Sequence, residues 1–167
     1  MQSQNDLEEQ LEECKQKLQE LERLKLVEES VTVGLREEGF SEKAIELFRY
    51  RKNFLTQQDP LKDEADAIGS FTGACGDQIT TYLKLRGDSI DDAKYTTDGC
   101  PGAVTSASAL IEMVKGKNIN EAAKLVVKDV IEFLKEGSTG LPRNMWDCCG
   151  IAIGALRQAI NNYRRTS

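Results

Sequence analysis

The sequence predicts an α+β fold, in which a small antiparallel three-stranded sheet packs against several helices and an extra heptad helix precedes them. Three observations support this prediction. Leucine recurs at heptad spacing within residues 5–26, residues 79–85 alternate between apolar and polar, and the chain becomes helical in pattern from Gly102 onward. We expect two parts, an N-terminal helical or coiled-coil extension over 1–33 and a globular domain over 41–167.

The N-terminal segment is rich in Glu, Gln, Lys and Leu, which are strong helix formers. A heptad seam steps by 4, 3, 4 and 3 residues through Leu7, Leu11, Cys14, Leu18 and Leu21. The next step lands on Lys25, and Gly34 and Gly39 are expected to interrupt the helical pattern. About three heptads are marginal for an isolated coiled coil. The segment could therefore self-associate, lie on the globular domain, or stay solvated.

The globular part begins with Ser41, a plausible N-cap for a helix over 42–51. Residues 57–66 contain Pro60 and are predicted to form a loop. The alternation over 79–85 predicts a strand, the turn signal at 86–89 makes it the first arm of a hairpin, and 66–73 are expected to add a third strand. Further helices are predicted over 103–115, 120–126, 128–136 and 149–164.

Composition excludes several classes of function. The formal net charge of −6 argues against binding to nucleic acid or to an anionic membrane, because the phosphates would be repelled. No stretch approaches the roughly 20 apolar residues of a membrane span, and residues 1–10 resemble neither a secretory signal nor a transit peptide. We therefore expect a cytoplasmic protein with reduced thiols. Histidine is absent, which removes the commonest general base and nitrogen ligand.

Three of the five cysteines lie in turns next to glycine: Cys75, Cys100 and Cys148. Cys100 and Cys148 are expected just before helices, whose N-termini favour thiolate and lower the pKa of a thiol. Glycine lets backbone N–H groups approach an anionic ligand. Thiolates select iron–sulfur clusters, zinc or Cu(I). Cys14 is interpreted as a seam residue, and Cys149 either packs in the last helix or supplies a spare thiol.

Several motifs resemble one known family over about residues 41–163. They are SEKAIELFRYRKNFL at 41–55, Ala74-Cys75-Gly76-Asp77, Gly99-Cys100, the stretch from Leu141-Pro142 to Cys148, and the helix with Ala155, Ala159 and Ile160. In order and spacing these resemble the U-type iron–sulfur cluster scaffolds, which comprise IscU, the N-terminal domain of NifU, and SufU. The resemblance implies a NifU-like and IscU-like fold.

The resemblance also implies a function. A cysteine desulfurase would supply sulfur, iron would enter, and a labile [2Fe–2S] cluster would form before transfer to apo-proteins, so that the protein is an iron-binding carrier and not an enzyme. Carried over, Cys75, Cys100 and Cys148 are the cluster ligands and sulfur acceptors, and Asp77 is the carboxylate beside them. The hard carboxylate binds iron less durably than thiolate, which suits a protein that must give up its cluster.

Two departures from the family pattern concern the region before the third cysteine. Asp147 stands where the family often has histidine. The fourth ligand is therefore open among Asp77, Asp147, Cys149 and a thiolate of a partner. Only Leu141 and Pro142 match the family's chaperone-binding segment L-P-P-V-K, which argues against recognition by the dedicated Hsp70-type chaperone.

Two other functions compete with the scaffold. One is a zinc-bound, SufU-type sulfur acceptor that activates a desulfurase, with Asp77 as the fourth tetrahedral ligand. The spacing from Cys100 to Cys148 lacks that subfamily's long insertion. The other is an interaction protein that keeps the fold, has lost cluster chemistry, and uses its heptad helix as an adaptor.

Overall fold

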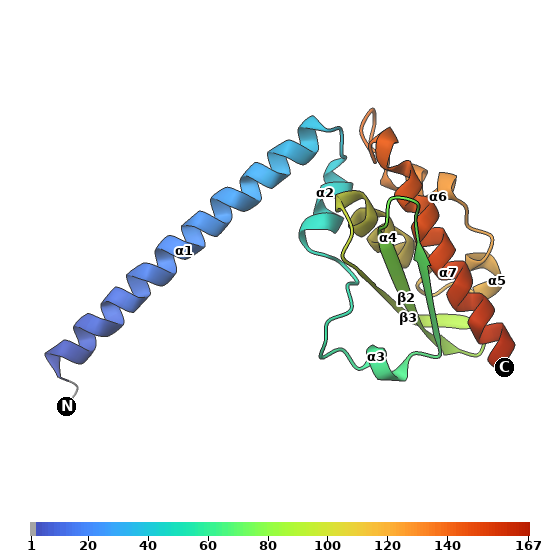
Figure 1. Ribbon diagram of the computed structural model, residues 1–167, viewed down its shortest axis with the longest axis horizontal. Helices are drawn as coiled ribbons and strands as arrows, with labels where there is room; N and C mark the ends of the chain where they lie inside the picture. Colours follow the sequence, from blue (N-terminus) through green and yellow to red (C-terminus); the bar gives the residue numbers. More distant parts are fainter. Residues whose placement is uncertain (1–2) are drawn as a thin grey trace. The chain divides into compact units, whose positions relative to one another are not determined.

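A computed structural model of the chain describes residues 3–167, and the chain divides after Glu38 into two compact units (Figure 1). The first unit contains one helix, α1 (Gln4–Glu37), whose N-terminus is closed by a capping box between Ser3 and Asp6. The expected interruption at Gly34 is wrong. One glycine costs a helix only about 1 kcal/mol relative to alanine, so α1 continues past it. It ends before Gly39, whose φ of +99° suits glycine.

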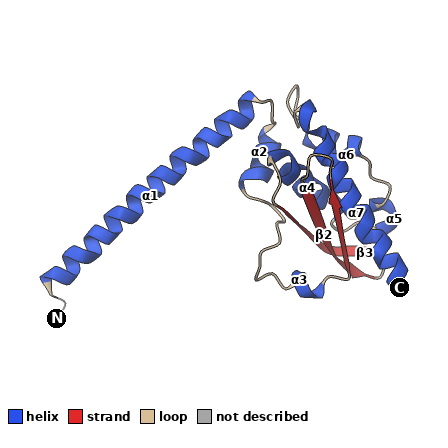
Figure 2. Ribbon diagram, viewed as in Figure 1, coloured by secondary structure: helices blue, strands red, loops and turns tan. Residues whose placement is uncertain are grey.

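The second unit, Gly39–Ser167, contains the predicted sheet. Its strands are β1 (Ala67–Thr72), β2 (Gln78–Arg86) and β3 (Ser89–Thr97), antiparallel and in the order β1-β2-β3 (Figure 2). Arg86 pairs with Ser89, so a two-residue turn joins the hairpin. The three strands confirm the predicted sheet, and alternate residues of β2 are buried, as the alternation over 79–85 predicted.

The helices of this unit follow the predicted order with shifted ends. They are α2 (Glu42–Arg49), α3 (Leu61–Glu64), α4 (Pro101–Val114), α5 (Ile119–Ala122), α6 (Val127–Leu134), the 3₁₀ turn η1 (Arg143–Met145) and α7 (Trp146–Thr166). Ser41 caps α2 as expected, because its hydroxyl accepts from the Ala44 N–H. The segment predicted as a loop over 57–66 includes α3, one short turn that follows Pro60.

The core forms where α7 and α4 pack against the sheet. Helix α7 runs along β1 and β2, and α4 contacts β3, α2 and α7 (Figure 2). Close approach of α7 to β1 depends on Gly69, because a Cβ there would lie 2.1 Å from the backbone nitrogen of Ala159. Helix α4 is buried on almost all sides and is built largely from small residues. This packing brings the N-termini of α4 and α7 into the same region, as the cysteine positions below show.

Among residues 3–167, no helix combines the length and the apolar character that a membrane span requires.

Candidate functional site

Cys100 lies where the sheet passes into helix α4, as predicted. It is the N-cap residue of α4, and Pro101 takes the first helical position, where its missing N–H costs nothing. The Cys100 backbone N–H donates to Asp77 Oδ2 at 3.2 Å. The end of β3 thus holds both the thiol and the carboxylate of the β1–β2 loop in place.

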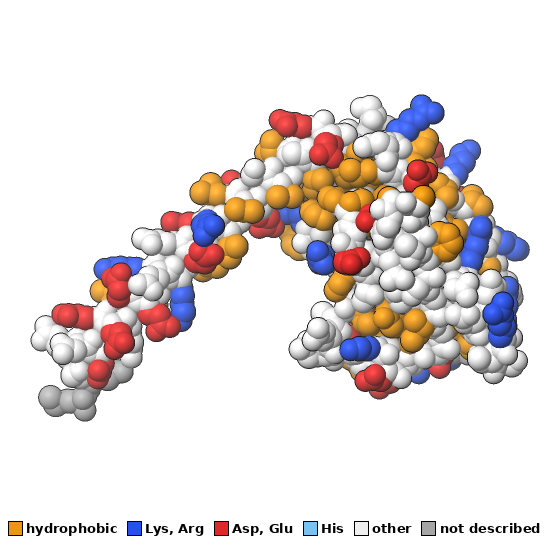
Figure 3. Space-filling model, in the orientation of Figure 1, with side chains coloured by type: hydrophobic (Ala, Val, Ile, Leu, Met, Phe, Trp, Pro, Cys, Tyr) orange, Lys and Arg blue, Asp and Glu red, His pale blue; other side chains and the backbone are white. Residues whose placement is uncertain are grey.

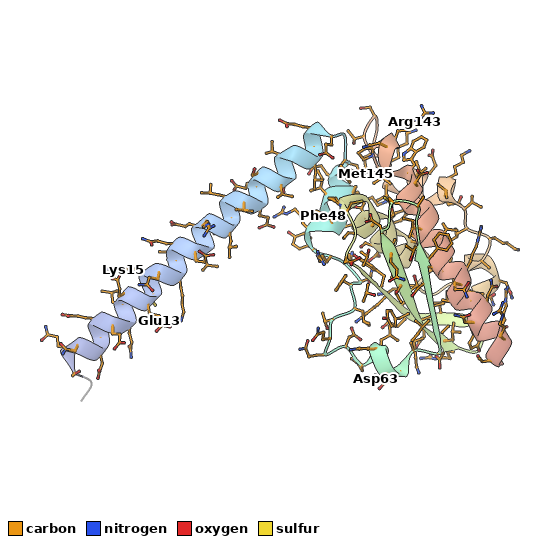
Figure 4. The ribbon with its side chains drawn as sticks, viewed as in Figure 1. Glu13, Lys15, Phe48, Asp63, Arg143 and Met145 are labelled. Carbon is orange, nitrogen blue, oxygen red and sulfur yellow. The ribbon has the colours of Figure 1, made fainter. Side chains whose placement is uncertain are left out.

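Cys148 lies inside helix α7, and the prediction that it precedes this helix is wrong. Helix α7 begins two residues earlier, at Trp146, because the 3₁₀ turn η1 leads directly into it. The indole N–H of Trp146 donates to the Leu141 carbonyl at 2.9 Å, and the Arg143 guanidinium lies over the indole ring. These contacts fix the segment that starts α7, in which Figure 4 labels Arg143 and Met145.

Three ligand side chains meet at this point. The ligand atoms of Asp77, Cys100 and Cys148 all lie within 4.8 Å of one another, and the two sulfurs are 3.7 Å apart. Cys148 is buried, whereas Asp77 and Cys100 are half-buried. Two thiols and a carboxylate form a donor set that suits iron or zinc, since thiolate is soft and carboxylate binds the harder ferrous or zinc ion.

Cys75 lies in the loop between β1 and β2, and its side chain is exposed. The loop is closed by the Gly76 N–H, which donates to the Gly73 carbonyl, and Gly76 takes a φ of +90° that favours glycine. Cys75 is outside the set of three, but its charge is close enough to raise the pKa of Cys148. An exposed thiol therefore stands beside a partly enclosed one.

Burial is the main influence on the pKa of the Cys148 thiol. It raises the pKa of the Cys148 thiol well above its usual range, and the negative charge of the Cys100 thiolate raises it further. The prediction that the helix N-terminus lowers the pKa of this thiol is therefore wrong, because desolvation outweighs the helix dipole here. Without metal, Cys148 is a neutral thiol at pH 7. A metal ion must displace its proton.

The other fourth-ligand candidates lie apart from this group. Cys149 is fully buried on α7, and its sulfur lies 3.3 Å from the Ser106 hydroxyl of α4. Burial raises its pKa to about 11. Asp147 is exposed and belongs to no group of metal-ligating side chains within the described residues. Of the carboxylates considered, Asp77 is the one that the structure brings to the two sulfurs.

Met145 was not predicted to lie near the site, and two of the glycines beside the cysteines have a packing role that was not predicted. A Cβ on Gly102 would lie 3.0 Å from the Cys148 sulfur and 3.1 Å from the Met145 sulfur, so the thioether stands beside the thiol. A Cβ on Gly99 would lie 2.9 Å from the Asp77 carboxyl carbon. These glycines make room for the ligands themselves. The three-residue spacing of Met145 and Cys148, which puts both on one helical face, is the signal that could have identified Met145.

Comparison with known proteins finds relatives of this chain in both sequence and structure. The family model described as "NifU-like N terminal domain" matches residues 40–167. Two iron-sulfur cluster assembly scaffold proteins IscU of Archaeoglobus fulgidus are each 36% identical over 127 residues, covering 75% of this chain and 77% of theirs. The nitrogen fixation protein NifU of Trichormus azollae is 36% identical over 131 residues, covering 75% of this chain and 42% of its own length.

Solved structures share the fold. A putative scaffold protein for the SUF system from Fervidobacterium islandicum matches with a TM-score of 0.52 and 22% identity, covering 72% of this chain and 96% of its own. The N-terminal part of a NifU-like protein from Brucella abortus matches with a TM-score of 0.54 and 17% identity, covering 80% and 99%. The two IscU relatives are named as scaffold proteins, in agreement with the expectation of a carrier and not an enzyme. The chain belongs to the NifU-like N-terminal domain family.

Proposed function

We propose that this protein is a cytoplasmic scaffold on which a labile [2Fe–2S] cluster is assembled from iron and desulfurase-derived sulfur and then passed to apo-proteins. The convergence of Asp77, Cys100 and Cys148 within 4.8 Å is the observation that carries the proposal. Family membership and the names of the IscU relatives support the same role. The cluster is cargo, so the site must both bind and release it.

Each side chain has a distinct part in this proposal. Cys75, the exposed thiol, accepts sulfur: its thiolate attacks the outer sulfur of a desulfurase persulfide, a new S–S bond forms, and the desulfurase thiolate leaves. Cys100 and Cys148 hold the metal with Cys75. The Cys148 thiol gives up its proton when metal binds, so loading releases a proton.

Asp77 is the fourth ligand in this proposal, and it favours release. Its carboxylate is already oriented by the Cys100 N–H at 3.2 Å, so it need not reorganise when iron arrives. A carboxylate is a harder ligand than thiolate and holds a cluster less durably. One weak ligand gives the recipient protein a place to begin ligand exchange.

Anaerobic reconstitution with iron, cysteine, a desulfurase and a thiol reductant tests the proposal, and the reductant supplies the electrons that convert persulfide sulfur to the sulfide of a cluster. We expect thiolate-to-iron charge-transfer bands and acid-labile sulfide in the natural protein, and their loss in Cys148→Ser. Cys149→Ser is the matched control, because Cys149 is the adjacent buried thiol but contacts Ser106 instead of the group. Absence of the bands while all thiols are reduced would refute the scaffold role.

A zinc-bound sulfur acceptor that activates a desulfurase is the second candidate. The same group of side chains favours this function, since three cysteines and one aspartate can complete a tetrahedral zinc site. Metal analysis of protein purified without added metal separates the two functions. Stoichiometric zinc that survives a chelator, with no cluster formed on reconstitution, would replace the scaffold proposal with this one.

A role as an interaction protein without cluster chemistry makes the opposite prediction for the cysteines. If Cys75→Ser left the cellular function intact, the adaptor role would replace the scaffold.

The segment from Leu141 to Met145 bears on how a cluster is transferred, because it matches the family's chaperone-binding sequence at only its first two positions. We propose that cluster transfer proceeds without the dedicated chaperone.

A further inference from the structure

Helix α1 carries an apolar seam that is exposed throughout. This heptad seam has five residues. Four of them are leucines whose side chains are 52–58% exposed, and the fifth, Cys14, is exposed as well. Figure 3 shows apolar side chains along this helix between acidic and basic ones. The heptad seam consists of Leu7, Leu11, Cys14, Leu18 and Leu21. Apolar surface at heptad spacing on a charged helix is the surface that a coiled-coil partner buries.

We propose that two copies of this chain pair through the heptad seam as a parallel, in-register coiled coil. In that register each of the five seam residues packs against its own counterpart in the second copy. The seam positions are then the d and a positions of the heptad, with Leu7 at d and Leu11 at a. The pairing does not depend on the cluster chemistry proposed above.

Charge complementarity favours the parallel register. Lys17 and Glu22 take the g and following e positions, which face each other across a parallel pair, so the dimer forms two such interhelical ion pairs. Within one helix the Lys17 ammonium contacts Glu13 at 2.7 Å, but both side chains are largely exposed. An exposed pair of this kind is worth only tenths of a kcal/mol, so its exchange for an interhelical pair costs little.

Charge repulsion disfavours one antiparallel register. When Leu11 faces the second copy's Leu21, like charges meet at the flanking positions, with Lys15 and Lys17 each facing its own counterpart. Glu8 then faces Glu22 as well. The parallel register has none of these repulsions.

A second antiparallel register avoids the repulsion but buries less. It pairs Leu7 with Leu18 and Leu11 with Cys14, and leaves Leu21 outside the contact. The parallel pair uses the whole seam and ends at Lys25, the polar residue at the next core position, which also restricts the register. Charge therefore disfavours the first antiparallel register, and burial disfavours the second.

The proposed pair has a consequence for the second units. In a parallel pair both chains leave the coiled coil at the same end, and each dimer carries two Gly39–Ser167 units. Each unit therefore has a high effective concentration relative to the other. About three heptads stabilise a dimer only weakly, so the pairing depends on concentration. Two sites per particle form at high concentration and one at low concentration.

Sedimentation velocity of the full chain over a range of concentrations tests the pairing. We expect the mass to rise from monomer to dimer as concentration rises. Leu18→Glu removes two buried leucines per dimer and should weaken association at least about a hundredfold. Leu26→Glu is the matched control, because Leu26 is 68% exposed on the same helix but lies off the seam. A monomer at every concentration, or a dimer indifferent to Leu18→Glu, would overturn the proposal.

Two further measurements test the direction of the helices. A short bismaleimide should join two chains of the natural protein through Cys14, and Cys14→Ser should abolish that product. Lys17→Glu should weaken the dimer, and adding Glu22→Lys should restore it, since the opposite charges then face each other again. A dimer sensitive to Leu18→Glu that shows neither the Cys14 product nor the restoration would be antiparallel and would overturn the register.

Discussion

Substitution of Gly69 by alanine tests how closely helix α7 must approach the sheet. A Cβ at this position would lie 2.1 Å from the Ala159 nitrogen, 2.5 Å from the Ala155 oxygen and 2.7 Å from the Ala159 Cα. All three are backbone atoms, so no side-chain rotation can relieve the overlap. Strand β1 and helix α7 would have to separate along the contact that forms the core of the unit.

The expected cost follows from two opposing contributions. Overpacking of a well-packed core costs about 1–3 kcal/mol, and we take the upper value because the obstructing atoms are backbone. Alanine in a strand recovers about 0.5–1 kcal/mol relative to glycine, since glycine loses more backbone freedom on folding. Gly69→Ala should therefore lower the free energy of unfolding of this unit by about 2 kcal/mol.

Urea unfolding followed by tryptophan fluorescence measures this loss. Trp146 is the single tryptophan and lies at the start of α7, so it reports on the unit that contains Gly69. With ordinary denaturant sensitivity, the midpoint should fall by about 1 M urea. Gly34→Ala is the control, because a Cβ there meets nothing within 4 Å and should leave the Trp146 transition unchanged. An unchanged midpoint in Gly69→Ala would refute the packing argument.

Three further predictions concern the candidate site. Asp77→Ala should lengthen the lifetime of a reconstituted cluster during transfer to a chelator, while exposed Asp147→Ala should not, and a shorter lifetime in Asp77→Ala would contradict the releasing role. Gly102→Ala should weaken zinc or iron binding about tenfold in a chelator competition, because its Cβ would lie 3.0 Å from the Cys148 sulfur, and unchanged affinity would show that the thiol adapts freely. Because the pKa of Cys149 is raised from 9.0 to about 11, the unfolded chain loses this proton first above pH 9, so unfolding becomes easier by about 1.4 kcal/mol per pH unit up to pH 11. Cys149→Ala should remove that part of the pH dependence of urea unfolding, measured with a reductant present. If the natural protein and Cys149→Ala had the same pH profile, Cys149 would not be the group responsible.

Local patterns predicted the elements of the fold well. The alternation around Ile79 and Leu83 predicted strand β2, and both side chains are fully buried. Ser41 marked the start of α2, and Cys100 marked the junction between β3 and α4. These signals depend on residues only a few positions apart, which is why a single sequence contains them. The least successful predictions were helix ends, at Gly34 and before Cys148, where small local preferences were outweighed by the continuing helix.

The sequence by itself determined which residue types could form a soft-metal site, because thiolate chemistry and the motifs around Cys75, Cys100 and Cys148 depend only on local sequence. Only the tertiary structure decided which of them meet. Cys100 and Cys148 are far apart in the chain, yet their sulfurs lie 3.7 Å apart because α4 and α7 pack on one sheet. The same packing turns Cys149 toward Ser106 and buries Cys148, so desolvation sets its pKa. Proximity and burial are properties of the packed chain, and no local pattern contains them.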